Sequence, residues 1–272
     1  MDLTLSVSGG WGGGVVTPSA LCVLAANPGP MTLDGTNTWV LSAAGSGRAV
    51  VVDPGPDDEE HLVSVLAAVR GLDAEVTTVL LSHGHLDHSA GARRFAELSG
   101  AGVRALDPAL CHAGEPLADG VVLEPDTLGL QVLAVPGHTA DSVAFLLPGE
   151  RALLTGDTVL GRGTAVVAHP DGRLGAYLES LARLREVAGV GGVELLLPGH
   201  GPVSTRPADV LQHYLDHRHA RLDQVRAALA AGTEGAAEVT SVVYAELDPV
   251  LRPAAELSVL AQLAYLEQHP GG

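Results

Sequence analysis

The chain has 272 residues, a formal net charge of −17 at pH 7 and a sequence pI near 4.9. A chain of this length forms one large domain with room for a small second unit. So acidic a surface repels polyanions, which excludes nucleic-acid binding driven by overall charge. The two cysteines, Cys22 and Cys111, stand far apart, which excludes a disulfide framework. The sequence contains neither a signal peptide nor an apolar run of membrane-spanning length, so we expect a cytoplasmic protein without membrane contact.

Short apolar runs that end in Gly, Pro or Asp predict strands, and segments with an apolar period near 3.6 predict helices between them. In chain order, the expected elements are strands beginning at Thr38 and Arg48, a helix over 57–70, a strand beginning at Val76, a helix over 87–98, strands beginning at Leu130, Ser142 and Arg151, a helix over 174–188, and a strand beginning at Val193. Strands therefore dominate this part, with helices expected on the outer faces of the sheets.

The pattern changes after Arg206. A long helix is predicted over 207–231, where Gly232 and Gly235 end it, and two amphipathic segments follow over 236–247 and 254–268. No convincing strand is predicted beyond this point. We therefore expect a strand-rich domain, residues 1–205, followed by a small helical domain, residues 206–272.

The stretch LLSHGHLDHSAGA, residues 80–92, places three histidines and one aspartate within six residues, directly after an apolar strand. His83 and His85 flank Gly84, so both imidazoles can turn toward one point, while Asp87 and His88 can address a second point beside it. Neutral imidazoles with carboxylate oxygens suit zinc first, and manganese or iron next. The cluster predicts metal binding in the loop that ends this strand.

Four ligands from one loop cannot complete two metal sites, and three further candidates follow other predicted strands. They are His138 after LQVLAVPG, Asp157 after RALLTG and His200 after VELLLPG. Taken singly, a histidine after a strand is commonly a surface or hydrogen-bonded residue, and an aspartate after glycine a turn former. Their shared position at strand ends favours seven ligands for two metals over a metal-free site. The remaining histidines, among them His61, are expected on helix or loop surfaces.

With these residues the sequence resembles the metallo-β-lactamase superfamily, whose H-x-H-x-D-H signature matches residues 83–88 and whose later positions match PGHT, TGDT and PGHG. The resemblance implies an α+β fold, an αββα sandwich. It also implies two ligand sets with one bridging residue: His83, His85 and His138 on one metal, Asp87, His88 and His200 on the other, and Asp157 between them.

Three longer stretches, NPGPMTLDGTNTWVL, GDTVLGRGTAVV and LLPGHGP, are similar to one branch of this superfamily, that of β-lactamase-like protein two, a single-strand endoribonuclease in animals. This resemblance implies a winged-helix-like C-terminal unit. The same branch resembles fungal enzymes that release polyketides from carrier proteins by thioester hydrolysis, so the resemblance leaves the substrate open.

Three further residues gain a possible role from the resemblance. Asn37 and Thr38, in GTNTW, are candidates for substrate contact, or equally for a polar turn that leads into a strand. Asp53 ends RAVVVD and is a candidate to hold a ligand histidine from behind, or to cap a helix. Asp87 is expected to bind metal and to accept a hydrogen bond from the nucleophilic water, with a purely ligating role as the alternative.

Two metals that share Asp157 would lower the pKa of a bridging water and present a hydroxide for hydrolysis. Two Zn²⁺ ions are expected, with Mn²⁺ or Fe²⁺ as alternatives. The resemblance narrowly favours a phosphodiesterase on single-stranded RNA over an acyl or thioester hydrolase, and a noncatalytic metal-binding module is the third hypothesis. The first C-terminal helix carries either a basic patch for RNA or a solvated face mixed with aspartates, formed by Arg206, Arg218, Arg221 and Arg226. The oligomeric state is left open.

Overall fold

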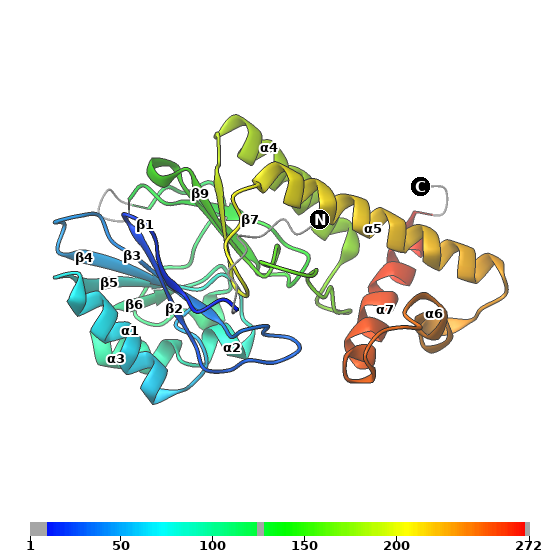
Figure 1. Cartoon of the computed structure of the whole chain (residues 1–272), viewed down its shortest axis with the longest axis horizontal. Coiled ribbons are helices and arrows are strands. Elements are labelled where there is room, and N and C mark those ends of the chain that lie inside the picture. The colour runs from blue at the N-terminus through cyan, green and yellow to red at the C-terminus, as the bar shows by residue number, and fades with distance from the viewer. Residues whose placement is uncertain (1–9, 124–127, 270–272) are drawn as a thin grey trace.

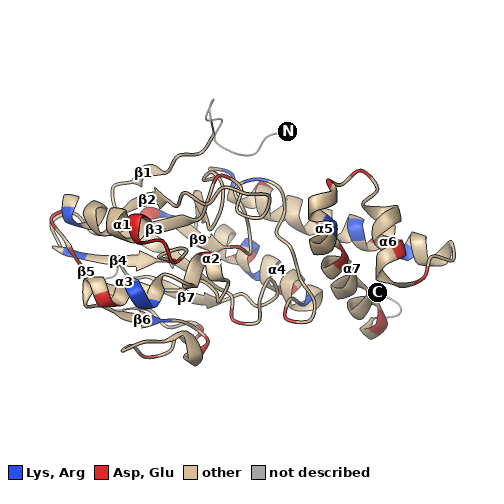
Figure 2. Ribbon diagram, turned by 90° about the horizontal axis from the view of Figure 1, so that it is seen from below, with Lys and Arg blue, Asp and Glu red and all other residues tan. Residues whose placement is uncertain are grey.

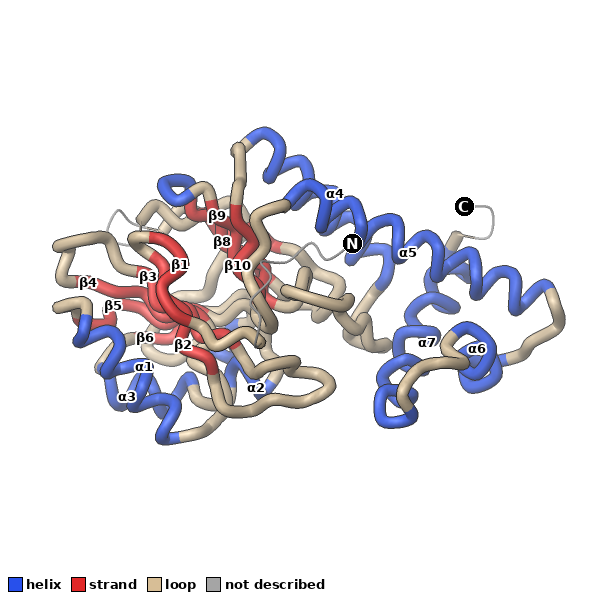
Figure 3. Tube along the Cα trace, in the orientation of Figure 1, coloured by secondary structure: helices blue, strands red, loops and turns tan. Residues whose placement is uncertain are grey.

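The computed structural model describes residues 10–123 and 128–269. Within them two β-sheets pack face to face and helices cover both outer faces, forming an αββα sandwich (Figure 1). A C-terminal part made of helices and loops follows the sandwich (Figure 3). The expected α+β class with a helical appendage is therefore confirmed.

The first sheet has six strands in the order β1-β2-β3-β4-β5-β6. Neighbours pair antiparallel from β1 to β4 and parallel from β4 to β6. The sequence pattern does not indicate β1, β2 or β6, and two of these strands are too short for a period to be recognised. The bounds are β1 Gly14–Thr17, β2 Ala20–Leu24, β3 Asn37–Leu41, β4 Arg48–Val52, β5 Glu75–Leu80 and β6 Gly102–Arg104.

Helices α1 (Glu59–Gly71) and α3 (Ala92–Ser99) cover the outer face of this sheet, and the short α2 (Leu86–Ser89) lies at its edge (Figure 1). The single helix expected over 87–98 is wrong, because the helix is interrupted at Gly91. The Gly91 N–H donates to the carbonyl of Gly55 at 3.0 Å, and a Cβ at this position would lie 2.6 Å from the Pro56 carbonyl oxygen. Contact with the loop after β4 therefore ends α2.

The second sheet has four strands in the order β10-β9-β8-β7, with β9 and β10 parallel and the other pairs antiparallel. Helix α4 (Leu174–Val190) and the first half of α5 (Pro207–Ala230) pack on its outer face. The strand bounds are β7 Gln131–Ala134, β8 Val143–Leu147, β9 Ala152–Gly156 and β10 Leu195–Pro198.

Alternation along the strands builds the core on both sides of each sheet. In β3 the side chains of Trp39 and Leu41 enter the space between the sheets, whereas Val40 faces α1 and α3. Phe145 and Leu197 enter the same space from the second sheet. Burial of each such side chain stabilises the fold by about 1.5–3 kcal/mol, so the interleaved faces fix the strand register.

One edge of the sandwich collects the carboxyl ends of five strands. β4 and β5 run parallel, as do β9 and β10, and β7 runs in the same direction as β9 because both pair antiparallel with β8. The residues that directly follow these strands therefore meet at one place: Asp53, residues 82–88, His138, Asp157 and His200.

The C-terminal part continues the sandwich core before it forms a core of its own. Val210, Leu211, Tyr214 and Leu215 of α5 belong to the cluster that buries the outer face of the second sheet. Farther along, Val225 packs with residues of α6 (Gly235–Val243) and α7 (Arg252–Gln268). From Pro207 to His269 the structure contains no strand, so the expected winged-helix-like unit consists of helices without a wing. No helix of the described residues is both long and apolar enough to cross a membrane.

We expect a fragment that ends at residue 205 to be far less stable than one that ends at residue 231. The shorter fragment loses the five α5 side chains of the sandwich core, Leu222 among them, each contributing about 1.5–3 kcal/mol, against a typical domain stability of about 5–15 kcal/mol. Circular dichroism melts of both fragments beside the full chain measure this difference. Equal melting of the two fragments would show that α5 does not support the sandwich.

Candidate metal centre

The loop after β5 and the helix α2 supply four of the seven expected ligands. His83 and His88 are buried, with 2% and 0% of their surface exposed, whereas His85 is exposed and Asp87 half-buried. The Gly55 N–H donates to the His88 carbonyl at 3.1 Å, which ties α2 to the loop after β4. This stretch thus supplies two buried ligands, His83 and His88, and two ligands that are accessible to solvent, His85 and Asp87.

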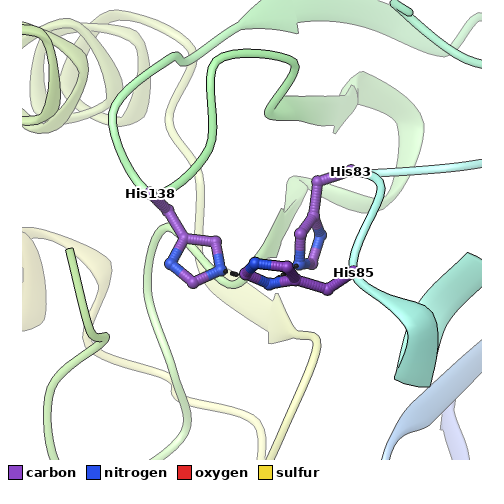
Figure 4. Close-up of side chains that lie close together, drawn as sticks. All are labelled: His83, His85 and His138. Carbon is purple, nitrogen blue, oxygen red and sulfur yellow. Dashed lines mark hydrogen bonds between the residues drawn. The ribbon is translucent and has the colours of Figure 1, made fainter. Parts of the chain in front are cut away.

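Three imidazoles converge in a first group, His83, His85 and His138. Figure 4 shows their rings close together, in T-shaped pairs, with His138 reaching in from the loop after β7. The Nδ1 atom of His85 lies 3.0 Å from Nε2 of His83 and 3.1 Å from Nε2 of His138. These three donor atoms form one of the clusters able to hold a metal ion.

A second group lies beside the first and contains Asp87, His88 and His200. The Nε2 atom of His200 lies 3.1 Å from Nε2 of His88 and 3.1 Å from Oδ2 of Asp87. Asp157 stands between the groups, because its Oδ2 lies 3.3 Å from Nε2 of His200 and 3.9 Å from Nε2 of His138. The structure therefore brings all seven expected ligands together in two adjacent sets.

The loop after β10 approaches the other ligands so closely that the residue before His200 must be glycine. A Cβ on Gly199 would lie 2.4 Å from Oδ1 of Asp157 and 2.8 Å from Cε1 of His88. Such distances are incompatible with any side chain. Gly199 is thus part of the centre, because its missing side chain admits a ligand from each sheet.

Each buried ligand histidine has a hydrogen-bond acceptor at its outward nitrogen. Nδ1 of His138 lies 2.7 Å from the Val166 carbonyl oxygen, and Nδ1 of His200 lies 3.0 Å from that of Gly35. Nδ1 of His88 lies 3.0 Å from Oδ2 of Asp53. A carbonyl or carboxylate accepts a hydrogen bond at each of these positions, so Nδ1 carries a proton and Nε2 is the nitrogen that faces the centre.

His83 obtains the same tautomer through Ser82. The Ser82 hydroxyl donates to Oδ2 of Asp53 at 2.6 Å, so it accepts from Nδ1 of His83, which lies 3.0 Å away. Asp53 also accepts from the Ser82 N–H at 2.7 Å. The structure therefore places Asp53 behind two ligand histidines, the role expected for it.

The donors fit a pair of metal ions. Two ligands of a tetrahedral zinc at about 2.0–2.1 Å lie about 3.3 Å from each other, close to the separations in both groups. In the first group, lone pairs of His83 and His138 face the same nitrogen of His85, an arrangement that a shared cation stabilises. Oδ1 of Asp157 is buried and has no hydrogen-bond partner among the described residues, as expected for an oxygen that binds metal.

The histidines of the two groups differ in their protonation at pH 7. Burial lowers the pKa of His83 well below its ordinary value and that of His138 to about 4, so both are neutral at pH 7. Burial opposes the charge of His200 as well, but the carboxylate of Asp157 raises its pKa to about 9. Asp157 and Asp53 likewise raise the pKa of His88. Without metal, His88 and His200 of the second group therefore hold protons at pH 7, whereas His83 and His138 of the first group do not.

Asn37 and Thr38 are fully buried and hold loops in place, so their surroundings do not support the expected substrate contact. The Asn37 amide donates to the carbonyls of Pro198 and Gly201, both at 2.9 Å. The Thr38 hydroxyl donates to the Asp53 carbonyl at 2.7 Å. Both side chains brace the loops that carry Asp53 and His200.

The expectation of a surface position for His61 is wrong, since only 6% of it is exposed. Its Nε2 lies 2.9 Å from the Thr38 hydroxyl, which already donates to the Asp53 carbonyl, so His61 is the donor. The supporting carbonyls of Gly35 and Val166 were also missed. No pattern of side chains in the sequence indicates which main-chain carbonyl will accept a hydrogen bond. Ser82, in contrast, could have been found, because it adjoins the histidine cluster.

A family model described as the metallo-beta-lactamase superfamily matches residues 31–200, which contain all of these ligands. The chain belongs to the metallo-β-lactamase superfamily. A Drosophila melanogaster member named beta-lactamase-like protein 2 homolog is 31% identical over 272 aligned residues, covering 93% of this chain and 89% of its own length. An Aspergillus fumigatus member named atrochrysone carboxyl ACP thioesterase is 35% identical over 222 residues, covering 79% of this chain. That match spans 66% of the fungal protein's own length, just under two thirds.

A solved structure of a beta-lactamase domain protein from Burkholderia ambifaria has the same fold. Its TM-score is 0.81 at 24% identity, over 95% of this chain and 88% of that one. Coverage of this extent includes the C-terminal helices as well as the metallo-β-lactamase sandwich.

We expect metal affinity of the second group to rise with pH up to about 9 through His200, whereas His138 of the first group adds no pH dependence above about 4. A metal must displace the proton that His200 holds below its raised pKa, whereas His138 is already neutral. Calorimetric titration in buffers of different ionisation enthalpy counts the protons released at each step. Equal proton release from the two sites would contradict this difference.

Changing Asp157→Ala should remove the carboxylate shared by both groups and leave the fold intact. The stoichiometry of bound metal should fall below two per chain, and hydrolysis should fall by a factor on the order of 100 or more. Metal analysis by mass spectrometry and a substrate assay measure the two effects. An Asp157→Ala protein with two metals and ordinary turnover would exclude the bridging position.

Proposed function

We propose that this metal-dependent hydrolase binds two zinc ions at the seven ligands and cleaves acyl thioesters. The fungal relative named as a carrier-protein thioesterase supports this substrate class. A mixed set of imidazole and carboxylate donors supports zinc, with iron or manganese as the competing ions. Cleavage of single-stranded RNA, the function expected from the sequence, stays a prediction and is the competing outcome.

The observation that carries this choice is the use of the α5 arginines within the protein. Arg206 pairs with Asp209 at 2.6 Å and Arg226 with Asp223 at 2.8 Å. Arg221 lies over the Tyr244 ring and donates to the Val243 carbonyl. An RNA-binding groove needs cations that face the solvent and pair with phosphates.

Arg218 is not part of any surface patch, because only 5% of it is exposed. The expectation that it contributes to a basic patch or a solvated face is therefore wrong. Figure 2 shows basic and acidic positions interspersed along α5 and α7. With a net charge of −17, this surface favours a substrate whose recognised part is not a polyanion.

Exposed apolar side chains in the loops that carry the centre suit an acyl group. Leu86 lies between the ligands His85 and Asp87 in the chain, and 76% of it is exposed. Met31 is half-exposed in the loop that ends at Gly35, whose carbonyl holds His200. Both side chains belong to loops that carry the centre, so an acyl chain can contact them while its carbonyl lies at the ligands.

When bound, the metal pair supplies a water of lowered pKa and polarises the electrophilic carbonyl. The protein's own residues hold and orient the reactants. Asp87 is the accessible carboxylate, with 31% of its side chain exposed, and we assign it to accept a hydrogen bond from the attacking water in addition to binding metal. Asp157 stays ionised, because His200 and His88 lower its pKa despite its burial.

A substrate panel on metal-loaded protein tests the proposal. It contains acyl thioesters of short and long chain, single-stranded RNA, a chromogenic phosphodiester and a cephalosporin. We expect thioester hydrolysis that a chelator abolishes and zinc restores. Cleavage of RNA without thioester turnover would favour the phosphodiesterase, and metal binding without turnover of any compound would favour a noncatalytic module.

The variant Leu86→Ala sharpens the same test. Loss of the exposed leucine should raise KM for a long-chain thioester several-fold and should leave KM for the short-chain substrate unchanged. The upper limit is roughly 10-fold, the change that about 1.5 kcal/mol of apolar contact supplies. Val190→Ala is the matched control, because Val190 is 87% exposed at the end of α4, away from the ligand loops. Equal KM changes for both chain lengths would count against acyl contact at Leu86.

A further inference from the structure

The loop that joins β9 to α4, residues 158–173, carries a contact essential to the metal centre. It begins directly after Asp157, and its Val166 carbonyl accepts a hydrogen bond from Nδ1 of His138 at 2.7 Å. The loop contains neither helix nor strand, and a segment of this length without regular structure needs other elements to fix its conformation. The orientation of His138 therefore depends on whatever holds this loop.

Three buried side chains from the outer helices hold the loop by its main chain. The Tyr177 hydroxyl of α4 donates to the Thr158 carbonyl at 2.6 Å. The Leu160 N–H donates to the Tyr214 hydroxyl of α5 at 2.8 Å. One turn later on α5, Nη2 of Arg218 donates to the Ala165 carbonyl. The two α5 contacts thus fix the segment on both sides of its exposed turn, residues 162–163.

Arg218 is the unusual member of this set. Its guanidinium lies 4.9 Å from the centre of the Tyr177 ring, and among the described residues no carboxylate lies within ion-pair distance of it. Its Nε is buried without a hydrogen-bond partner. A buried cation without a counterion costs stability that an apolar residue would not cost. What the charge provides instead is a charge-assisted hydrogen bond, which is stronger and more directional than a neutral one.

We infer that Arg218 is a positioning residue of the metal centre, acting from the C-terminal helix α5 through the loop to His138. Its hydrogen bond holds the carbonyl of Ala165, one peptide unit before the Val166 carbonyl that accepts the hydrogen bond of His138. Without that bond the neighbouring carbonyl is free to turn. His138 then loses its fixed tautomer and ring orientation, and the first group loses its third ligand. This role does not depend on which substrate the enzyme cleaves.

The variant Arg218→Met tests the inference, with Arg221→Met as a matched control. Arg221 lies one turn farther along α5 and makes the same kinds of contact, over the ring of Tyr244 at 4.6 Å and to the carbonyl of Val243 at 3.1 Å. Its partners belong to α6 and the residue after it, and none of them supports a ligand. The two variants therefore remove the same chemistry with and without a connection to His138.

The measurement is a Co²⁺ titration of the chelator-stripped full chain, followed by visible absorption, in which the three-imidazole site and the carboxylate-containing site give different spectra. We expect Arg218→Met to weaken the first site by about 10–100-fold, the usual effect of removing support behind a ligand, and to leave the second site unchanged. Arg221→Met should bind at both sites as the wild type does. Ordinary first-site affinity in Arg218→Met would overturn the inference.

Melting of the metal-free proteins separates positioning from simple destabilisation. Because a buried charge has been removed, Arg218→Met should melt within a few degrees of the wild type while its first site is weakened. Equal weakening of both sites, in step with a large fall in Tm, would also overturn the inference. Wild-type protein that bound no Co²⁺ would instead refute the metal centre itself.

If Arg218→Met does not fold, Arg218→Lys carries the test. Lysine keeps a cation beside the Tyr177 ring but is shorter and lacks the planar fork, so the contact with Ala165 should be lost. A folded Arg218→Lys protein is expected to show the same selective loss at the first site. In metal-free protein, the His138 Nδ1 proton should exchange with solvent faster than in Arg221→Met, and equal exchange in the two variants would contradict the connection.

Discussion

The centre depends on one constraint, which is that each buried ligand histidine keeps its proton on the outward nitrogen. Only then do the inward nitrogens offer lone pairs at one place. The acceptors that enforce this are Asp53 for His88, the Gly35 carbonyl for His200 and the Val166 carbonyl for His138. They come from loops of both sheets, so no ligand is ready until the strands have paired in the correct register. Fold and metal site are therefore specified together, since a slip of one residue would reverse the faces of a strand.

The outward acceptors also give the two metal groups different electrostatic character. In the first group they are a carbonyl and a hydroxyl, and the buried imidazoles of His83 and His138 stay neutral. In the second group Asp53 lies behind His88, while Asp87 and Asp157 lie in front of His200. The second group is therefore the more anionic, and it compensates with protons when metal is absent. Imidazole donors favour borderline ions and carboxylate donors favour harder ions, so the two groups differ in the ions that their donors favour.

Most of the site could be predicted because its ligands are side chains that follow recognisable strands. Apolar periodicity also indicated the strand-rich part and the helices of the C-terminal part, whereas the sandwich class came from the family resemblance of the ligand motifs. The outward acceptors at Gly35 and Val166 could not be found, because a carbonyl is present in every residue and only the folded loop selects it. The burial of Asn37, Thr38 and His61 could not be found for a related reason. Polar residues are commonly exposed, and the partners that allow their burial lie in distant parts of the chain.

Arg218 differs from these cases, because the sequence does contain a signal for its burial. Leu211, Tyr214, Leu222 and Val225 are spaced four or seven residues from it, so it lies on the apolar stripe of α5. The paired arginines lie outside this stripe, where a spacing of three residues brings Arg206 to Asp209 and Arg226 to Asp223. The four arginines are close in the sequence, but the geometry of the helix separates Arg218 from the others. Counting them together as one patch therefore misplaces Arg218. The apolar stripe also runs without interruption from the sandwich core into the C-terminal helices, so the chain changes its composition near Arg206 while its packing continues. A helix with this stripe can transmit a change in the C-terminal part to the loop behind His138, which a domain joined by a flexible linker could not do.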